Sequence, residues 1–477
     1  MPDAIPISDE HAQRVIDIRD KWDRYDGQHP LSLIEGQGDV NDNVALNNLA
    51  TIVDTGADFL LGSGSGEVEF GVMLDGEVVD DATAYLEEVW EHNRKRTLLR
   101  NTATDGGIAG QFAFKLVPAE DEKGMHRIIL IDPLELVIQT DPADIDRRIG
   151  YAIDTTIWDA SGTLAKGRRR EQHTLDEGEQ SWTVQWLVTD TPIEMSGEGR
   201  KVQWVPDPQR PDPETWPHAF PAIIDGQNLP APHREWGRSD LSPDILHMQE
   251  AINRTASNEQ KTLRHFAHPQ LWAAGEDPTK LQGFIDASIG SVICLPAGSA
   301  LNALAISHQG LAAASLFRES LTDKLFEVAR TPRIAAGKVD NVGTLSGVAL
   351  LILYRPLIAK TQTKRDTYGD VLRELSERIL QLAGYGDALR VVVTWPDVLP
   401  KDYASDVETA RELKDLGVSF RTICERLDID YEQEMDRVRE EQADPMGDAH
   451  GMLARNEELQ AQIDEMRNGG NVDQLGA

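Results

Sequence analysis

The sequence contains very little cysteine and no long apolar run. Two cysteines, Cys294 and Cys424, stand among 477 residues. They are too few for a disulfide framework, as is typical of proteins in a reducing cytoplasm. A membrane helix needs about 20 consecutive apolar residues, whereas the strongest candidate, 348–354, is followed at once by Arg355 and Pro356. The N-terminus lacks the basic-then-apolar pattern of a signal peptide. We therefore expect a soluble protein of the cytoplasm, with no membrane partner.

Positive charge is also scarce. The chain has 47 Lys and Arg against 81 Asp and Glu, a net charge of −34, and only 14 of the basic residues are lysines. Affinity for nucleic acid depends on Lys and Arg contacts to phosphates, so a broad nucleic-acid-binding surface is not expected. The acidity itself is explained by a need for solubility or by a salt-adapted host. Two short basic runs, 94–96 and 168–170, are interpreted as solvated surface.

The motifs of common enzyme classes are missing. The single Gly-Lys pair, Gly337-Lys338, is followed by Val339 where a phosphate loop needs Ser or Thr. No Gly-x-Ser-x-Gly elbow occurs. His265 and His268 are three residues apart but lack the companion ligands of a metal site. We therefore expect no enzyme activity, no cofactor and no metal.

One acidic cluster keeps an enzymatic alternative open. Asp141, Asp144 and Asp146 could serve a metal-dependent DNA-processing enzyme. However, their spacing departs from the Asp-x-Asp-x-Asp-Gly pattern of a calcium loop, and Asp141-Pro142 is ordinary turn chemistry. A turn is therefore the favoured interpretation.

The first 235 residues alternate helical and strand patterns. Helical periodicity marks 8–26, 41–61, 81–92 and 95–107. Strand patterns mark 68–73, 111–118, 126–131, 134–139, 149–158 and 181–189. Residues 160–180 and 206–218 are polar, Pro-rich or charged, so they are predicted to be loops. This order indicates an α+β region with a meandering antiparallel sheet.

A long helix is predicted over 242–266. Ser242 is a suitable N-cap and Pro243 a suitable first helical residue. The apolar stripe is short: Ile245, Met248 and Ile252. Beyond it the helix is polar on most sides, which is typical of a helix that packs against copies of itself or is not stable alone.

Helical patterns continue to the end of the chain. A helix over 311–330 is stopped by Thr331-Pro332. A very long helix over 346–383 should be kinked by Pro356 and ended by Gly384. A strand follows at 391–395. Short helices are expected after it at 402–415, 419–427 and 431–442.

Five segments, taken in order, resemble one known family. They are Trp22–Leu31 with its Tyr-x-Gly-x-His-x-Leu pattern, the helix Asn47–Gly62, the Asp-Pro-containing Ile128–Asp141, the stretch Gly237–Ser257 with Gln249 and Asn253, and Leu345–Leu350. This order is similar to the portal proteins of tailed bacteriophages, of the siphophage type. The likeness covers about residues 10–440. The acidity and the C-terminal tail depart from it.

The resemblance implies a mainly helical α+β fold and a structural role. Portal proteins are usually rings of twelve subunits at one capsid vertex, where they pass double-stranded DNA during packaging and ejection. Their partners would be the terminase large subunit, a head-completion or adaptor protein, and the capsid and scaffolding proteins. The implied parts are a wing (1–235 and 346–400), two stem helices (236–266 and 306–331), a clip (267–305), a tunnel loop (332–345), a crown (401–445) and a mobile tail (446–477).

The resemblance also assigns candidate site residues. The DNA channel would be lined by basic and polar residues of the stem and the tunnel loop: Arg254, Lys261, Arg264, Arg318, Lys324, Arg333, Lys338 and Asn341. Partner-binding candidates in the clip are Glu276, Asp277, Lys280 and Asp286. Arg333 and Lys338 would touch phosphates transiently, or instead pair with acidic neighbours in adjacent subunits. A capsid or tail adaptor without a channel is a further alternative.

Overall fold

The structure is a computed structural model. It describes residues 4–30, 43–62, 66–119, 124–158, 165–176, 181–189, 204–267, 271–274, 300–303, 308–333, 347–398, 410–411, 413–426, 431, 435 and 439. The chain divides into two compact units, Met1–Leu399 and Pro400–Ala477, which we describe separately. Helices and antiparallel sheets make up the described part, as the α+β prediction requires.

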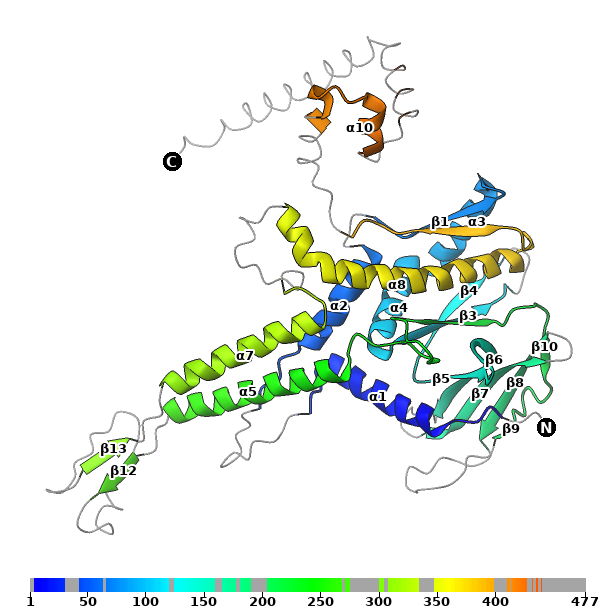
Figure 1. The fold of residues 1–477 in the computed structure, drawn as a ribbon. Helices are drawn as coiled ribbons and strands as arrows, with labels where there is room; N and C mark the ends of the chain where they lie inside the picture. Colours follow the sequence, from blue (N-terminus) through cyan, green and yellow to red (C-terminus); the bar gives the residue numbers. More distant parts are fainter. Residues whose placement is uncertain are drawn as a thin grey trace, which may run out of the picture. The chain divides into compact units, whose positions relative to one another are not determined.

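An antiparallel sheet forms one layer of the first unit (Figure 1). Its strand order is β10-β8-β7-β6-β5, with β9 paired to β8. The strands are β5 (Leu136–Asp141), β6 (Asp144–Trp158), β7 (Ala165–Asp176), β8 (Ser181–Thr189), β9 (Trp204–Pro206) and β10 (Glu214–Trp216). The loop prediction for 160–180 is therefore wrong over β7, and that for 206–218 is wrong over β10.

Strand β7 escaped prediction because its buried side chains are polar. Arg170 is fully buried, and its guanidinium donates to both carboxylate oxygens of Asp154 at 2.6 and 2.7 Å. The same guanidinium lies 4.4 Å from the ring centre of Trp204 and donates to the carbonyl of Ile5 at 2.6 Å. Buried charge is tolerated when it is paired and fully hydrogen-bonded. The basic run 168–170 is thus not simply solvated surface.

A second body packs three helices and α8 around two small sheets. The sheets are β11-β3-β4 and β14-β1-β2. The elements are β1 (Glu69–Leu74), β2 (Glu77–Val78), α2 (Asn48–Leu61), α3 (Asp80–His92), α4 (Lys95–Ala109), β3 (Gln111–Val117), β4 (Arg127–Ile131), β11 (Ile223–Gln227), α8 (Gly347–Leu382) and β14 (Arg390–Thr394). A shared apolar core includes Trp90, Phe112 and Leu375. The basic run 94–96 contributes Lys95, which is buried between Glu67 and Glu91 at 3.4 Å from each.

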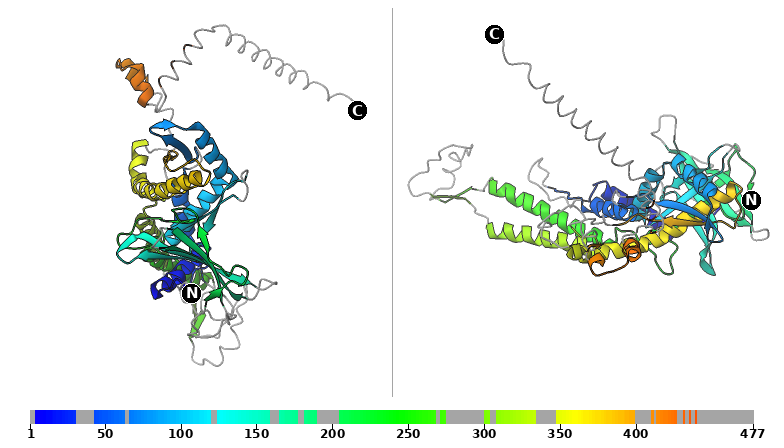
Figure 2. Two further views of the ribbon diagram at one scale, coloured as in Figure 1. Left: turned by 90° about the vertical axis from the view of Figure 1, so that its right-hand side faces the viewer. Right: turned by 90° about the horizontal axis from the view of Figure 1, so that it is seen from above.

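Two long helices lie side by side, as Figure 2 shows. They are α5 (Pro243–Ala267) and α7 (His308–Val328), and the short antiparallel strands β12 (Leu271–Ala274) and β13 (Ala300–Ala303) pair beyond them. Helix α5 begins at Pro243, as predicted, with the Ser242 carbonyl accepting from the Leu246 amide at 3.1 Å. Helix α1 (Asp9–Tyr25) is capped by Ser8.

The remaining boundaries follow local signals. Helix α2 begins at Asn48 rather than at 41, because the Asn47 side chain caps it. Helix α8 contains Pro356, and the helix bends in its N-terminal part (Figure 1). Gly384, with φ of 85°, follows its end. Within the described residues, no helix has the length and apolarity to cross a membrane.

The second unit is described mainly by α10 (Phe420–Arg426), which lies within the predicted helix 419–427. Ile423 and Cys424 are buried in this unit. The predicted helices 402–415 and 431–442 fall largely outside the described residues, and the predicted tail 446–477 falls entirely outside them.

Candidate functional site

The polar side of α5 binds a segment of its own chain. Asn253 Oδ1 accepts from the Leu46 amide at 2.9 Å, and Ser257 Oγ accepts from the Val44 amide at 2.9 Å. Gln249, one turn earlier, hydrogen-bonds to the Leu46 carbonyl and to Asn253. These three side chains are at most 3 % exposed. The expectation that the polar face packs against copies is therefore wrong for this part of the helix.

A buried charge cluster joins the start of α5 to α8. The Asp240 carboxylate is completely buried and lies 3.1 Å from Lys360 Nζ and 2.5 Å from Lys364 Nζ. Burial alone would raise the pKa of Asp240, but the two lysines outweigh it and hold that pKa below its usual value. Burial lowers the pKa of Lys364, against the attraction of Asp240. Two ammonium groups thus share one carboxylate.

Tight backbone packing fixes this cluster. The Asp240 amide donates to the Gly107 carbonyl at 2.8 Å. A side chain at Gly106 would lie 1.9 Å from the Tyr368 hydroxyl, which itself donates to Asn228 at 3.1 Å. Next to these glycines, burial first and the Asp132 charge second raise the pKa of Asp105 to about 7. The α4–α8 contact is therefore a polar, close-packed joint.

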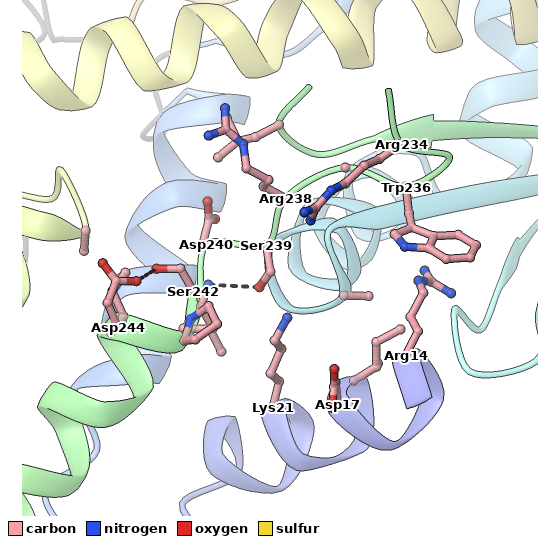
Figure 3. A pocket seen from close by; sticks show the side chains of 18 of the residues that line it. Arg14, Asp17, Lys21, Arg234, Trp236, Arg238, Ser239, Asp240, Ser242 and Asp244 are labelled. Atoms are coloured by element: carbon pink, nitrogen blue, oxygen red, sulfur yellow. Dashed lines mark hydrogen bonds between the residues drawn. The ribbon is translucent and has the colours of Figure 1, made fainter. Parts of the chain in front are cut away.

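A pocket of about 850 Å³ opens beside this joint. It is lined by α1, the segment 229–242, the start of α5, the end of α7 and part of α8. Figure 3 shows Lys21 and Arg14 reaching in from α1, opposite Arg234 and Arg238. The Arg14 guanidinium lies 4.7 Å from the ring centre of Trp236 and donates to Gln111 at 2.6 Å. Burial is the main reason that the pKa of Arg14 falls to about 10.

A comparison with protein families matches the part of the chain that holds the long helices. Residues 237–447, which contain α5, α7 and α8, match the family described as phage portal protein, SPP1 Gp6-like. The resemblance to siphophage-type portal proteins is confirmed. The family is structural and non-enzymatic, and the match supports a phage portal function in general. No curated protein matches the chain.

Three of the predicted channel residues are engaged in ion pairs within the chain. Arg318 on α7 pairs with Glu259 on α5 at 2.9 Å. The exposed Lys324 pairs with Glu327 at 2.6 Å, one turn along α7. Arg333 pairs with Asp323 and lies 3.9 Å from Glu319. Arg333 therefore lies beside two acidic residues of its own chain, Asp323 and Glu319.

The structure brings two predicted portal residues together. Arg318 and Arg333 line one cavity of about 260 Å³, and Asn48 lines it as well. No sequence signal linked them, because residues 319–332 separate them along the chain. Asn48 also donates to Gln249 at 3.0 Å. The cavity therefore adjoins the buried polar side chains of α5, Gln249, Asn253 and Ser257, which we call the polar ladder.

The other predicted stem residues lie on α5. Arg254 is exposed and forms no ion pair or hydrogen bond with the described residues. Lys261 and Arg264, about two and three turns further along, are half-buried. Lys338 and Asn341, together with the clip candidates Glu276, Asp277, Lys280 and Asp286, lie outside the described residues, so those predictions stay predictions.

The acidic cluster of β5 and β6 forms a hairpin turn. Asp141 pairs with Asp144 in the ladder, and Asp141 Oδ1 accepts from the Ala143 amide at 2.9 Å. Arg147 donates to the same carboxylate at 2.9 Å. Asp141 and Asp144 thus flank the turn, as the favoured interpretation has it, and Asp146 follows within β6. Among the described residues, no three His, Cys, Asp or Glu side chains gather as a metal site would require.

Proposed function

We propose that the chain is one subunit of a ring, of about twelve copies, that conducts double-stranded phage DNA through a capsid vertex. The supporting observation is the family match over 237–447, which coincides with a pair of long adjacent helices followed by a long bent one. In this proposal α5 and α7 are the stem, and the intervening residues 267–305 are the clip. Residues 332–345 are the tunnel loop and 401–445 the crown, and residues 1–235 together with 346–400 are the wing.

The acidity of the chain suits such a conduit. Twelve copies at −34 each would carry about −400 charges. A wall of this sign repels phosphates, so DNA passes along it without being held. The ion pairs of Arg318, Lys324 and Arg333 reduce the number of cations that remain available to hold phosphates. Transient contacts then fall mainly to Arg254 and Lys261 on α5.

The partners follow from the same proposal. The terminase large subunit, or an adaptor, would dock on the clip, where Glu276, Asp277, Lys280 and Asp286 are the candidates. Capsid and scaffolding proteins would surround the wing. The subunit itself would carry out no catalysis, because ATP hydrolysis belongs to the motor.

The ring is the first part of the proposal to test. Native mass, measured by mass photometry at several salt concentrations, is expected to correspond to about a dozen subunits. Negative-stain images should show a central hole. A monomer or dimer at every salt concentration would contradict the proposal. DNA cleavage with added Mg²⁺ or Mn²⁺ is the companion assay, and cleavage above background would favour the enzymatic alternative.

The channel role of α5 needs a separate test. The double variant Arg254→Gln and Lys261→Gln removes two charges from α5, and Arg254 carries no ion pair among the described residues. We expect intact rings with an altered rate of DNA packaging in a reconstituted head. Arg373→Gln with Arg390→Gln, two exposed changes on α8 and at the start of β14, is the matched control for the loss of two charges. Unchanged packaging in the α5 variant would remove these two residues from the channel.

A further inference from the structure

The 850 Å³ pocket has an excess of positive charge in a strongly acidic chain. Six basic side chains line it against four acidic ones. One of the acids, Asp240, is already shared by Lys360 and Lys364. The pocket therefore reverses the sign of the chain as a whole, which is −34.

Several of these cations form no ion pair with the described residues. The side chains of Lys21, Arg234 and Arg330 form no hydrogen bond or ion pair with the described residues. Arg238 donates only to a carbonyl, that of Pro230 at 3.2 Å. Lys21 is half-buried, and burial lowers its pKa. Arg234, Arg238 and Arg330 are exposed, so three guanidinium groups at this pocket are accessible to an anionic partner, with which they can form charge-assisted hydrogen bonds.

The size and form of the pocket indicate a protein segment as that partner. Ligand pockets span about 300–1,000 Å³, so this one accommodates several side chains rather than a single carboxylate. Its cations reach in from facing walls, α1 on one side and the segment 229–242 on the other (Figure 3). A projecting turn can enter between such walls, whereas a DNA duplex lies along a surface.

The chain carries an exposed surface of the opposite sign. It consists of the turn between β1 and β2 and the outer face of α3, and we name it the acidic turn surface: Asp75, Glu77, Asp80, Asp81, Glu87 and Glu88. All six residues are exposed, and none forms an ion pair with the described residues. Asp75 and Gly76 have φ of 53° and 92°, the two positive values of a tight I′ hairpin turn. Beside them Val78 is 62 % exposed.

The pocket and the acidic turn surface belong to different places on one chain. Helix α1 and the β1–α3 region lie on opposite sides of α8 in Figure 1. Two complementary patches at different places give a head-to-tail interface, and such an interface closes into a ring when the rotation allows. One chain thus carries both halves of a repeating contact.

We propose that the pocket receives the acidic turn surface of a second copy of this chain. This inference rests on the proposed ring. Asp75 and Glu77 at the tip of the turn enter between Lys21 and Arg234, and the exposed Val78 packs at the rim. The contact is electrostatic, so it weakens as salt rises.

Charge reversal tests this contact from both sides. The pocket variant Lys21→Glu and Arg234→Glu changes two side chains that form no hydrogen bond or ion pair within the described part of the chain. The turn variant Asp75→Lys and Glu77→Lys reverses the other half. We expect each variant to weaken ring association at least about tenfold, because like charges then face each other. The quadruple variant, which combines all four substitutions, should regain most of the association. A matched control, Arg373→Glu and Arg390→Glu, makes the same charge change on α8 and β14 and should assemble as wild type does.

The outcomes separate this inference from the proposed function. If wild type never forms rings, both fail. Only this inference fails if the pocket variant forms rings as well as wild type does. It also fails alone if the quadruple variant does not recover ring association while its melting temperature is unchanged. If the pocket variant keeps its rings but loses DNA retention, the pocket serves DNA and the inference is overturned. A second measurement uses Arg234→Cys with Glu77→Cys, for which an oxidised ring should give a ladder of disulfide-linked subunits.

Discussion

The buried cluster of Asp240, Lys360 and Lys364 makes the sharpest prediction about stability. Asp240→Asn keeps the shape of the side chain but removes the only carboxylate that the two lysines share. Lys360 retains the Ala329 carbonyl at 3.1 Å, whereas Asp240 is the one charge partner that Lys364 has among the described residues. Removing one partner of a buried pair costs about 3–5 kcal/mol. We therefore expect the free energy of unfolding of the first unit to fall by about 4 kcal/mol.

The expected change is measurable by thermal and urea unfolding. At roughly 2.1 cal/mol/K per residue, the 399 residues of this unit give an unfolding entropy of about 0.8 kcal/mol/K. A loss of about 4 kcal/mol then lowers the midpoint by about 5 °C. The exposed pair of Lys324 and Glu327 supplies the control, since Glu327→Gln should cost at most about 1 kcal/mol.

A double variant tests the cause of the loss. Asp240→Asn with Lys364→Met removes the buried ammonium as well as its partner, so part of the lost stability should return. The reasoning is refuted if Asp240→Asn stays within about 1 kcal/mol of wild type. It is also refuted if adding Lys364→Met to Asp240→Asn lowers the free energy of unfolding further, by as much as an independent loss would.

Three further predictions concern single positions. The folded-state pKa of Asp105 is raised to about 7, so its contribution to stability is present below the unfolded pKa of about 4 and is lost as pH rises toward 7. Asp105→Asn should remove up to about 4 kcal/mol of this pH dependence, and a variant whose stability curve parallels wild type between pH 4 and 7 would contradict the shift. Gly110→Ala places a Cβ 2.7 Å from the Gly237 carbonyl oxygen at a φ of 83°, so it should lower the melting temperature clearly more than Gly384→Ala, which has a similar φ and open space around it. Asn253→Ala should cost about 1–2 kcal/mol and speed proteolysis at 43–47; equal proteolysis rates would show that its hydrogen bond does not hold that segment.

Local signals allowed the helices to be predicted, but not the partners of polar side chains. Pro243 and Gly384 fix where helices start and stop through their own backbone, so periodicity and capping found α5 and α8. Arg170 was misread because its partners Asp154 and Trp204 are brought to it by strand pairing. The sequence offers no local sign of such pairing, and a polar strand then looks like a loop.

The candidate site divides in the same way. The basic character of Arg318 and Arg333 is visible in the sequence, but their shared cavity depends on how α7 ends. The pocket beside α1 was not foreseen, because Lys21 and Arg234 are isolated charges more than 200 positions apart. Gln249 and Asn253 did form part of the family resemblance, although their hydrogen bonds to residues 44–46 could be recognised only in the structure.

The polar ladder of α5 also sets the order in which the chain can fold during synthesis. Ser257 binds the Val44 amide across 213 positions, and Trp90 binds Ser376 across 286. At about 5–20 residues per second, residues 43–47 wait some 10–40 seconds for α5, and the core around Trp90 waits longer for α8. Ribosome-bound chains therefore expose α2 and α3 without their final packing. Any contact between copies that needs these helices in their final packing therefore forms only after α8 has left the ribosome.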